Sequence, residues 1–107
     1  MSAQIVLKAL AEPRRPAILR LVRGEARSVG EIARHFDISQ QAVSQHLQVL
    51  REAGLVDVRQ EAQRRIYTLR PEALMEVDEW LDGYRALWQN RLDALHTGIA
   101  RGKKARK

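Results

Sequence analysis

The chain has 107 residues, of which 30% are charged and 45% apolar, as is typical of one small globular domain and not of a disordered chain. It contains no cysteine, which excludes disulfides, thiolate metal sites and cysteine nucleophiles, and it has no apolar run long enough to cross a membrane. The net charge of +6 favours a polyanionic partner, and the N-terminus lacks the pattern of a secretory signal, so we expect a cytoplasmic protein.

Charge is unevenly distributed along the chain. Residues 1–70 have a net charge of +5 and residues 71–100 a net charge of −4, whereas residues 101–107 contain five basic residues and no acidic one. We expect a domain over 1–98 and a disordered basic tail over 99–107, which would add nonspecific attraction to nucleic acid. The distribution predicts that different parts of this small domain have different partners.

The beginning of the chain has the pattern of two helices. The apolar segment over 4–10 predicts the first, and Pro13 suits the first position of the second. The second helix is expected to run to about Arg23, where Gly24 ends it.

The next segment predicts two further helices. Ser28 and Glu31 have the spacing of a capping box, which predicts a third helix over 30–36. Ser39 is expected to cap a fourth helix over 40–53, which the following glycine ends. Because only about three residues join these helices, the pair has the helix-turn-helix arrangement.

The rest of the chain predicts a hairpin and a long helix. Apolar and polar residues alternate over 55–59 and 65–69, as in strands, and the polar residues 60–64 between them form the expected tip. Pro71 begins the last helix, which runs to about Gly98. The fold class is therefore mainly helical with a small β-hairpin, a winged helix-turn-helix in the order of four helices, two strands and one helix.

The fourth predicted helix has one apolar and one polar face. At about 100° per residue, the apolar face belongs to the core. The opposite face carries amides and a hydroxyl and almost no charge, and glutamine can pair with adenine through two hydrogen bonds. These residues are Gln40, Gln41, Ser44, Gln45 and Gln48. They predict a face that reads base edges, and the alternative is a solvated face that happens to be rich in glutamine.

Basic residues accompany this helix. Arg64 and Arg65 lie at the predicted hairpin tip and Arg59 on the facing strand, which suggests contact with phosphates or the minor groove. Arg14 and Arg15, at the start of the second helix, are candidates for further phosphate contacts.

The last helix carries a long apolar stripe with steps of three and four residues. Its members are Leu74, Val77, Leu81, Tyr84, Trp88, Leu92, Leu95 and Ile99, widened by Trp80 and Leu87. A domain of this size has too small a core to cover the stripe, so we expect a homodimer, with Ile5, Val6 and Leu10 of the first helix completing the interface. The alternatives are packing within the domain and an aromatic ligand pocket at Trp80, Tyr84 and Trp88.

Four segments resemble the ArsR/SmtB family of bacterial winged-helix repressors over about residues 5–97: LAEPRRPAILRLV, SVGEIARHFDISQQAVSQHLQVLREAGLVDVR, RRIYTLRPE and DEWLDGYRALWQNRLDAL. The string SQHLQVLREAGLV is the most specific, and the last segment resembles a subgroup without thiolate metal sites. The resemblance implies a homodimer that represses its own operon and leaves DNA when a signal binds. It also implies that Gln41, Ser44 and Gln45 touch base edges.

Two features depart from that family. Ala62 stands in the wing tip where the family usually has glycine, and a positive φ there would suit alanine poorly. The third helix, GEIARHF, has no Cys-x-Cys thiolate site.

A metal site on the last helix is the remaining possibility. Asp93 and His96 of one chain could face Asp93 and His96 of the other chain in a dimer, but the four ligands that zinc normally needs are not found, so we expect no metal and no cofactor. His46 is expected to be a half-buried packing residue, and any inducer is unidentified.

The function predicted from these patterns is a dimeric, sequence-specific transcriptional repressor that binds double-stranded DNA at an imperfect palindromic operator. No membrane partner is expected. No glycine-rich phosphate loop, metal-ligand set or nucleophile–base pair is present, so we do not expect an enzyme. The alternative is a winged-helix module for protein–protein or RNA contact, which would favour apolar or acidic residues on the outer face of the fourth helix.

Overall fold

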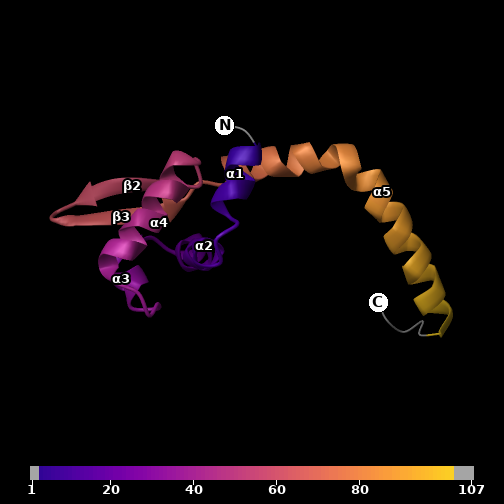
Figure 1. Ribbon diagram of the computed structural model, residues 1–107, viewed down its shortest axis with the longest axis horizontal. Coiled ribbons are helices and arrows are strands. Elements are labelled where there is room, and N and C mark those ends of the chain that lie inside the picture. Colours follow the sequence, from indigo (N-terminus) through magenta and orange to yellow (C-terminus); the bar gives the residue numbers. More distant parts are fainter. Residues whose placement is uncertain (1–2, 103–107) are drawn as a thin grey trace. The chain divides into compact units, whose positions relative to one another are not determined.

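The computed structural model describes residues 3–102, and within them the side chains of residues 3–95 (Figure 1). The elements are α1 (Ala3–Ala9), α2 (Arg14–Gly24), β1 (Arg27–Ser28), α3 (Val29–Ala33), α4 (Gln40–Glu52), β2 (Val56–Glu61), β3 (Arg64–Leu69) and α5 (Glu72–Gly102). This order confirms the predicted four helices, hairpin and long helix. The chain divides into two compact units, residues 1–77 and residues from 78 onward, and α5 begins in the first and continues in the second.

Local capping begins both helices of the helix-turn-helix. Ser28 Oγ accepts a hydrogen bond from the Glu31 backbone N–H at 3.2 Å, and Glu31 Oε1 accepts one from the Ser28 N–H at 2.8 Å, which completes the predicted capping box. Ser39 Oγ accepts from the Ala42 N–H at 3.0 Å at the start of α4. Both predicted helix starts are confirmed.

The connection between α3 and α4 is longer than predicted. The helix α3 ends at Ala33 rather than at residue 36, so residues 34–39 join the two helices. The chain tightens there because the N–H groups of His35 and Phe36 bond to carbonyls three residues back, at 3.0 and 3.1 Å. Such turns satisfy the last carbonyls of a helix without extending it.

The helix α4 ends in a Schellman motif. Gly54 has a φ of 79°, the left-handed region that favours glycine, and its N–H bonds to the Arg51 carbonyl oxygen at 2.9 Å. The Leu55 N–H bonds to the Leu50 carbonyl oxygen at 2.9 Å. The chain thereby turns sharply from α4 into β2.

A single apolar core holds α1 to α4 and the sheet together. The predicted inner face of α4, Val43, Leu47 and Leu50, is fully buried. It packs in one cluster with Ile18 of α2, Ile32 of α3 and Tyr67 of β3, among others. Fully burying an aliphatic side chain contributes roughly 1.5–3 kcal/mol, so these residues fix which side of α4 faces outward.

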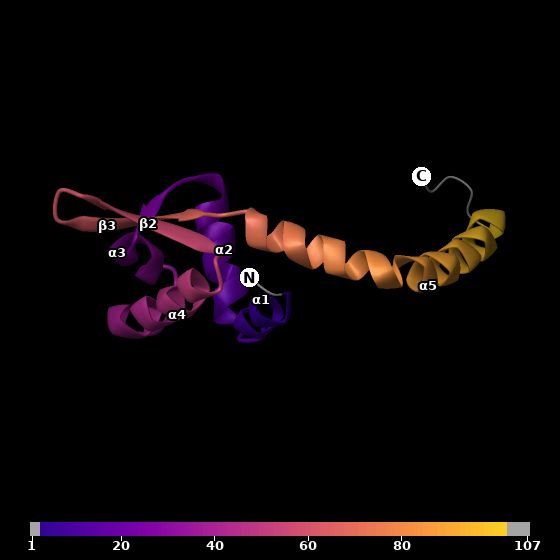
Figure 2. The same ribbon diagram turned by 90° about the horizontal axis from the view of Figure 1, so that it is seen from above.

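The sheet has three antiparallel strands in the order β1-β3-β2, one more than predicted. The strand β1 has two residues, which pair with Tyr67 and Ile66. Two residues are too few to show an alternation of apolar and polar residues in the sequence, so β1 can be assigned only from its hydrogen-bonded pairing with β3. The strands β2 and β3 continue past the helices as a two-stranded hairpin, the wing (Figures 1 and 2).

The tip of the wing is shorter than predicted. Glu61 pairs with Arg64, so Ala62 and Gln63 alone form the loop. Arg64 is therefore the first residue of β3 and does not lie in the loop. Ala62 has a φ of 58°, the only positive φ at a non-glycine residue in the described part of the chain. The backbone therefore keeps the left-handed turn at a position where glycine is favoured.

Ala62→Gly is expected to raise the free energy of unfolding by about 0.5–1 kcal/mol. A left-handed L-residue costs roughly 1–2 kcal/mol, and the greater freedom of glycine in the unfolded chain offsets part of the gain. Urea unfolding followed by circular dichroism measures the change. Gln63→Gly is the control, because its φ is not positive and glycine there should lower stability. An Ala62→Gly variant no more stable than the wild type would contradict the prediction.

The helix α5 begins at Glu72 and continues to Gly102, past the predicted end near residue 98. It thus includes the first four residues of the expected tail, and the remaining tail residues lie outside the described part of the chain. Near its start, Ala73 is buried and Val77 packs against the core. Within the described residues, no helix combines the length and hydrophobicity needed to cross a membrane.

Candidate nucleic-acid interface

The structure places all five predicted reading residues on the exposed side of α4, opposite its buried face. Their side chains differ in whether they form hydrogen bonds within the protein. The Gln48 amide donates to a carboxylate oxygen of Glu52, one turn along, at 2.9 Å. Gln41, Ser44 and Gln45 make no side-chain hydrogen bond to another residue within the described part of the chain. Hydrogen-bonding groups are therefore most available over the first turns of α4.

A hollow of about 510 Å³ lies between the N-terminal end of α4 and the wing. Gln40, Gln41 and Ser44 line it from α4, and Arg64 and Arg65 line it from β3. The structure thus brings two separately predicted groups together. The other predicted residues, Gln45, Gln48 and Arg59, do not line this hollow.

Residues that the sequence did not single out as binding residues complete the hollow. They are Ser28, Val29, Gly30 and Gln63. The only sequence signal at these positions is the capping box, which marks the N-terminal end of α3. A capping box predicts where a helix begins, but it does not predict that this end of the helix lies beside the wing. A Cβ at Gly30 would lie 3.3 Å from Gln40 Nε2, so the glycine leaves room for that amide.

The wing arginines are exposed and carry weak intramolecular contacts. Arg64 Nη2 lies 3.8 Å from Glu31 Oε2, and Arg59 Nη2 lies 3.4 Å from Glu61 Oε2. The Arg65 guanidinium lies 5.9 Å from the centroid of the Tyr67 ring. Exposed ion pairs contribute little to stability, so a phosphate can replace these carboxylates at small cost.

Glu31 places a negative charge beside this basic hollow. The hydrogen bond from the Ser28 backbone N–H lowers the pKa of the Glu31 carboxyl below its ordinary value, and the positive charges of Arg64 and Arg34 act in the same direction. The carboxylate therefore stays ionised at neutral pH, where it opposes any phosphate approaching Arg64.

The two arginines at the start of α2 have different surroundings. Arg14 pairs with Glu12 through Nη1 and Oε2 at 3.0 Å. Arg15 instead directs its guanidinium to His46 and to the Ala9 carbonyl, in a partly buried position. Two of its N–H groups are therefore used inside the domain, and its expected phosphate contact stays a prediction. His46 is partly buried, as predicted.

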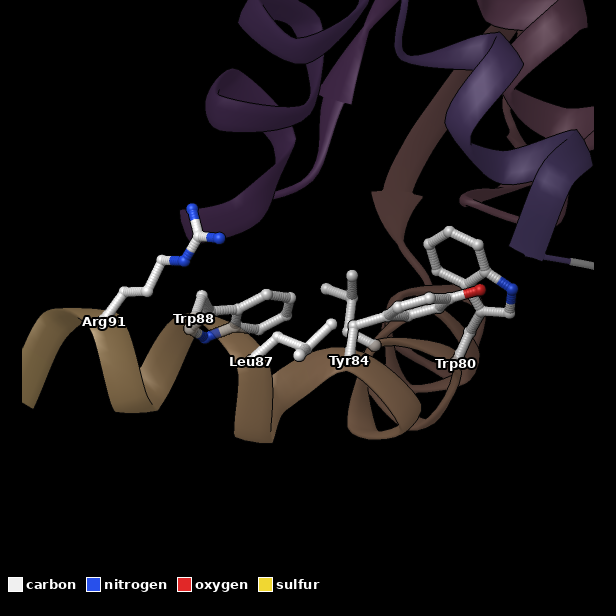
Figure 3. Close-up of a pocket in the computed structure, with 6 residues that line it drawn as sticks. Trp80, Tyr84, Leu87, Trp88 and Arg91 are labelled. Carbon is white, nitrogen blue, oxygen red and sulfur yellow. The ribbon is translucent and has the colours of Figure 1, made fainter.

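The second unit presents an apolar surface on α5. Trp80, Leu81, Tyr84, Leu87, Trp88 and Arg91 line an open depression of about 490 Å³. Figure 3 shows the labelled side chains projecting from the same side of the helix. The Trp80 and Tyr84 rings lie 5.4 Å apart between centroids, yet these side chains remain 42% and 49% exposed, and Leu87 is 67% exposed. Large exposed apolar patches of this kind mark interaction surfaces.

The remaining predicted interface residues vary in exposure. On α1, Ile5 is 51% exposed, whereas Val6 is fully buried in the core of its own domain and cannot touch a partner. Leu10 and Val77 are partly buried against that core. On α5, Leu74, Leu92 and Leu95 are exposed, and the side chain of Ile99 lies outside the described residues.

The considered metal pair is Asp93 and His96, and the side chain of His96 also lies outside the described residues. The described side chains contain no group of three His, Cys, Asp or Glu that could hold a metal.

Comparison with known proteins places the chain in a family. A helix-turn-helix domain family matches residues 10–59. The transcriptional activator HlyU of Vibrio cholerae is 48% identical over 67 residues, which are 63% of this chain and 62% of HlyU, less than two thirds of that relative's length. The transcriptional repressor SdpR of Bacillus subtilis is 34% identical over 76 residues, which are 71% of this chain and 84% of SdpR.

Solved structures agree with this placement. The crystal structure of an ArsR family transcriptional regulator superimposes with a TM-score of 0.74 and 26% identity, covering 80% of this chain and 89% of that one. Winged helix-turn-helix architecture, sequence identity and coverage point to the same group. The chain belongs to the ArsR family of helix-turn-helix transcriptional regulators.

Proposed function

We propose that this regulator is a homodimeric, sequence-specific DNA-binding repressor of its own operon, acting in the cytoplasm. The observation that carries the proposal is the hollow between α4 and the wing, where uncharged hydrogen-bonding side chains face two exposed arginines. Amides and hydroxyls can read base edges, and exposed arginines on a wing can bind phosphates, which carry no sequence information. A surface with both kinds of group is suited to duplex DNA, with α4 contacting the bases and the wing contacting the backbone.

The apolar surface of α5 supports the dimer. Its aromatic and aliphatic side chains are exposed in a single chain, and a second copy would remove them from water. Two copies related by a two-fold axis would present two α4 helices to successive major grooves, about 34 Å apart. The operator would then be an imperfect palindrome. The relatives include a protein named as an activator and one named as a repressor, and repression is the role that we infer for this chain.

DNase footprinting on the DNA just upstream of the protein's own gene tests this function. We expect a protected segment with two similar half-sites whose centres are about one helical turn apart. A reporter driven by the same DNA should be less active when the protein is present. A protein that protects no segment there, or that prefers RNA to the duplex, would instead act as the protein–protein or RNA module that is the alternative reading of this fold.

A further inference from the structure

We propose that Arg15 is a positioning residue for the reading helix, through His46. The Arg15 Nε–H donates to His46 Nδ1 at 3.2 Å, and Nη1 donates to the Ala9 carbonyl oxygen at 3.1 Å. One guanidinium on α2 thus joins the C-terminal end of α1 to the middle of α4. The inference rests on the proposed DNA-binding function, because it assigns a role in placing the residues that read bases.

The contact specifies one tautomer of the histidine. A guanidinium donates hydrogen bonds and accepts none, so His46 must present an unprotonated Nδ1 and carry its proton on Nε2. The Ala9 carbonyl is one of the last carbonyls of α1, which have no partner within the helix, and a cation is favourable there. The planar fork of arginine can serve both acceptors at once, whereas the single ammonium of lysine cannot do so with the same geometry.

The position of His46 explains why the contact matters for recognition. It lies between Gln45, on the exposed reading face, and Leu47, which is fully buried. A bond at this position holds the rotation of α4 about its own axis. Base readout requires side chains to be held within about 0.5 Å of their working geometry, so a small rotation weakens it.

Few side chains of α1 are fully buried in the core. Of the seven residues of α1, Val6 and Ala9 are buried. A hollow of about 250 Å³, lined by Ile5, Ala9, Arg15 and Val49 among others, lies beside the contact. The two Arg15 hydrogen bonds therefore supply a directional link where side-chain packing is incomplete.

The test uses the full-length chain carrying Arg15→Lys, His46→Leu, the two together, or His46→Asn, whose amide oxygen lies near the position of Nδ1. Arg20→Lys is the control, because Arg20 is an exposed arginine on the same helix. Fluorescence anisotropy measures affinity for the footprinted operator and for a scrambled duplex. Histidine ¹⁵N NMR reports the His46 tautomer without DNA, and thermal melts confirm that each variant is folded at the assay temperature.

Arg15→Lys and His46→Leu are each expected to lower operator affinity about tenfold, as for loss of one hydrogen bond to a charged group, and to leave the scrambled duplex unaffected. The double variant should be no worse than Arg15→Lys alone, because that variant already lacks the contact with His46. His46→Asn should retain most of the affinity. The wild-type histidine should carry its proton on Nε2, and Arg15→Lys should admit some of the Nδ1–H tautomer.

Three results would overturn the inference. Equal losses on both duplexes for Arg15→Lys, with no loss for His46→Leu, would make Arg15 a phosphate contact. Lower melting temperatures with unchanged operator affinity would show a role in stability alone. A wild-type histidine without the Nε2–H tautomer would contradict the contact itself. A wild type that does not prefer its operator would refute the proposed function instead, and the NMR measurement would still decide the Arg15–His46 contact.

Discussion

Leu81→Glu and Trp88→Glu are each expected to convert a dimer into a monomer at micromolar concentration and to reduce operator affinity about 100-fold or more. Both residues line the depression on α5. A carboxylate buried at an apolar interface without a partner is strongly disfavoured, so the second copy cannot seat there. Losing one of two linked DNA contacts forfeits an avidity of roughly 10²–10⁴.

Sedimentation velocity measures the oligomeric state, and anisotropy measures operator binding. Gln89→Glu is the matched control, because it adds the same charge at an exposed position of α5 outside the depression, and it should remain a dimer. A monomeric wild type that binds its operator tightly would refute the dimer. The depression would then be better explained by the aromatic ligand pocket or by packing within the domain.

Base readout and phosphate anchoring are expected to separate by mutation. Ser44→Ala and Gln45→Ala should each cost roughly 1–3 kcal/mol of operator binding and relax sequence preference at symmetric positions. Arg64→Ala combined with Arg65→Ala should weaken operator and scrambled DNA alike. It should also flatten the dependence of log affinity on log salt by up to about 0.9 for each lost phosphate contact.

Glu31→Gln supplies the opposite change at the same hollow. A capping box accepts glutamine as well as glutamate, so the start of α3 is preserved while the charge beside Arg64 is removed. This variant should bind both duplexes more tightly than the wild type. The measurement is affinity for both duplexes at several salt concentrations. If the alanine changes at Ser44 and Gln45 alter only nonspecific binding, or the arginine changes alter only sequence preference, then the roles of α4 and the wing are reversed.

Much of the helix-turn-helix could be predicted from the sequence because its signals are local. The capping box at Ser28, the cap at Ser39 and the glycine after α4 each act within a few residues. Helical periodicity also decides which face of α4 is buried, since neighbours at three and four residues share a side. These rules predicted the reading face, although its contact with DNA stays a proposal.

Other features depend on partners far away in the chain, and only the tertiary structure decided them. The strand β1 exists because two residues pair with β3, and the two-residue wing loop follows from the register of β2 against β3. That register leaves Ala62 in a left-handed conformation, a cost that local propensity alone would avoid.

The arginines show the same division. Composition and position made both Arg64 and, as a weaker candidate, Arg15 possible phosphate contacts. The structure directs Arg15 inward, to a histidine 31 residues away, and leaves Arg64 exposed beside the hollow. Ile5 and Val6 differ likewise, one exposed and one fully buried. A sequence determines residue chemistry and local geometry by itself, whereas the direction of a side chain depends on which distant segment packs against it and satisfies its hydrogen bonds.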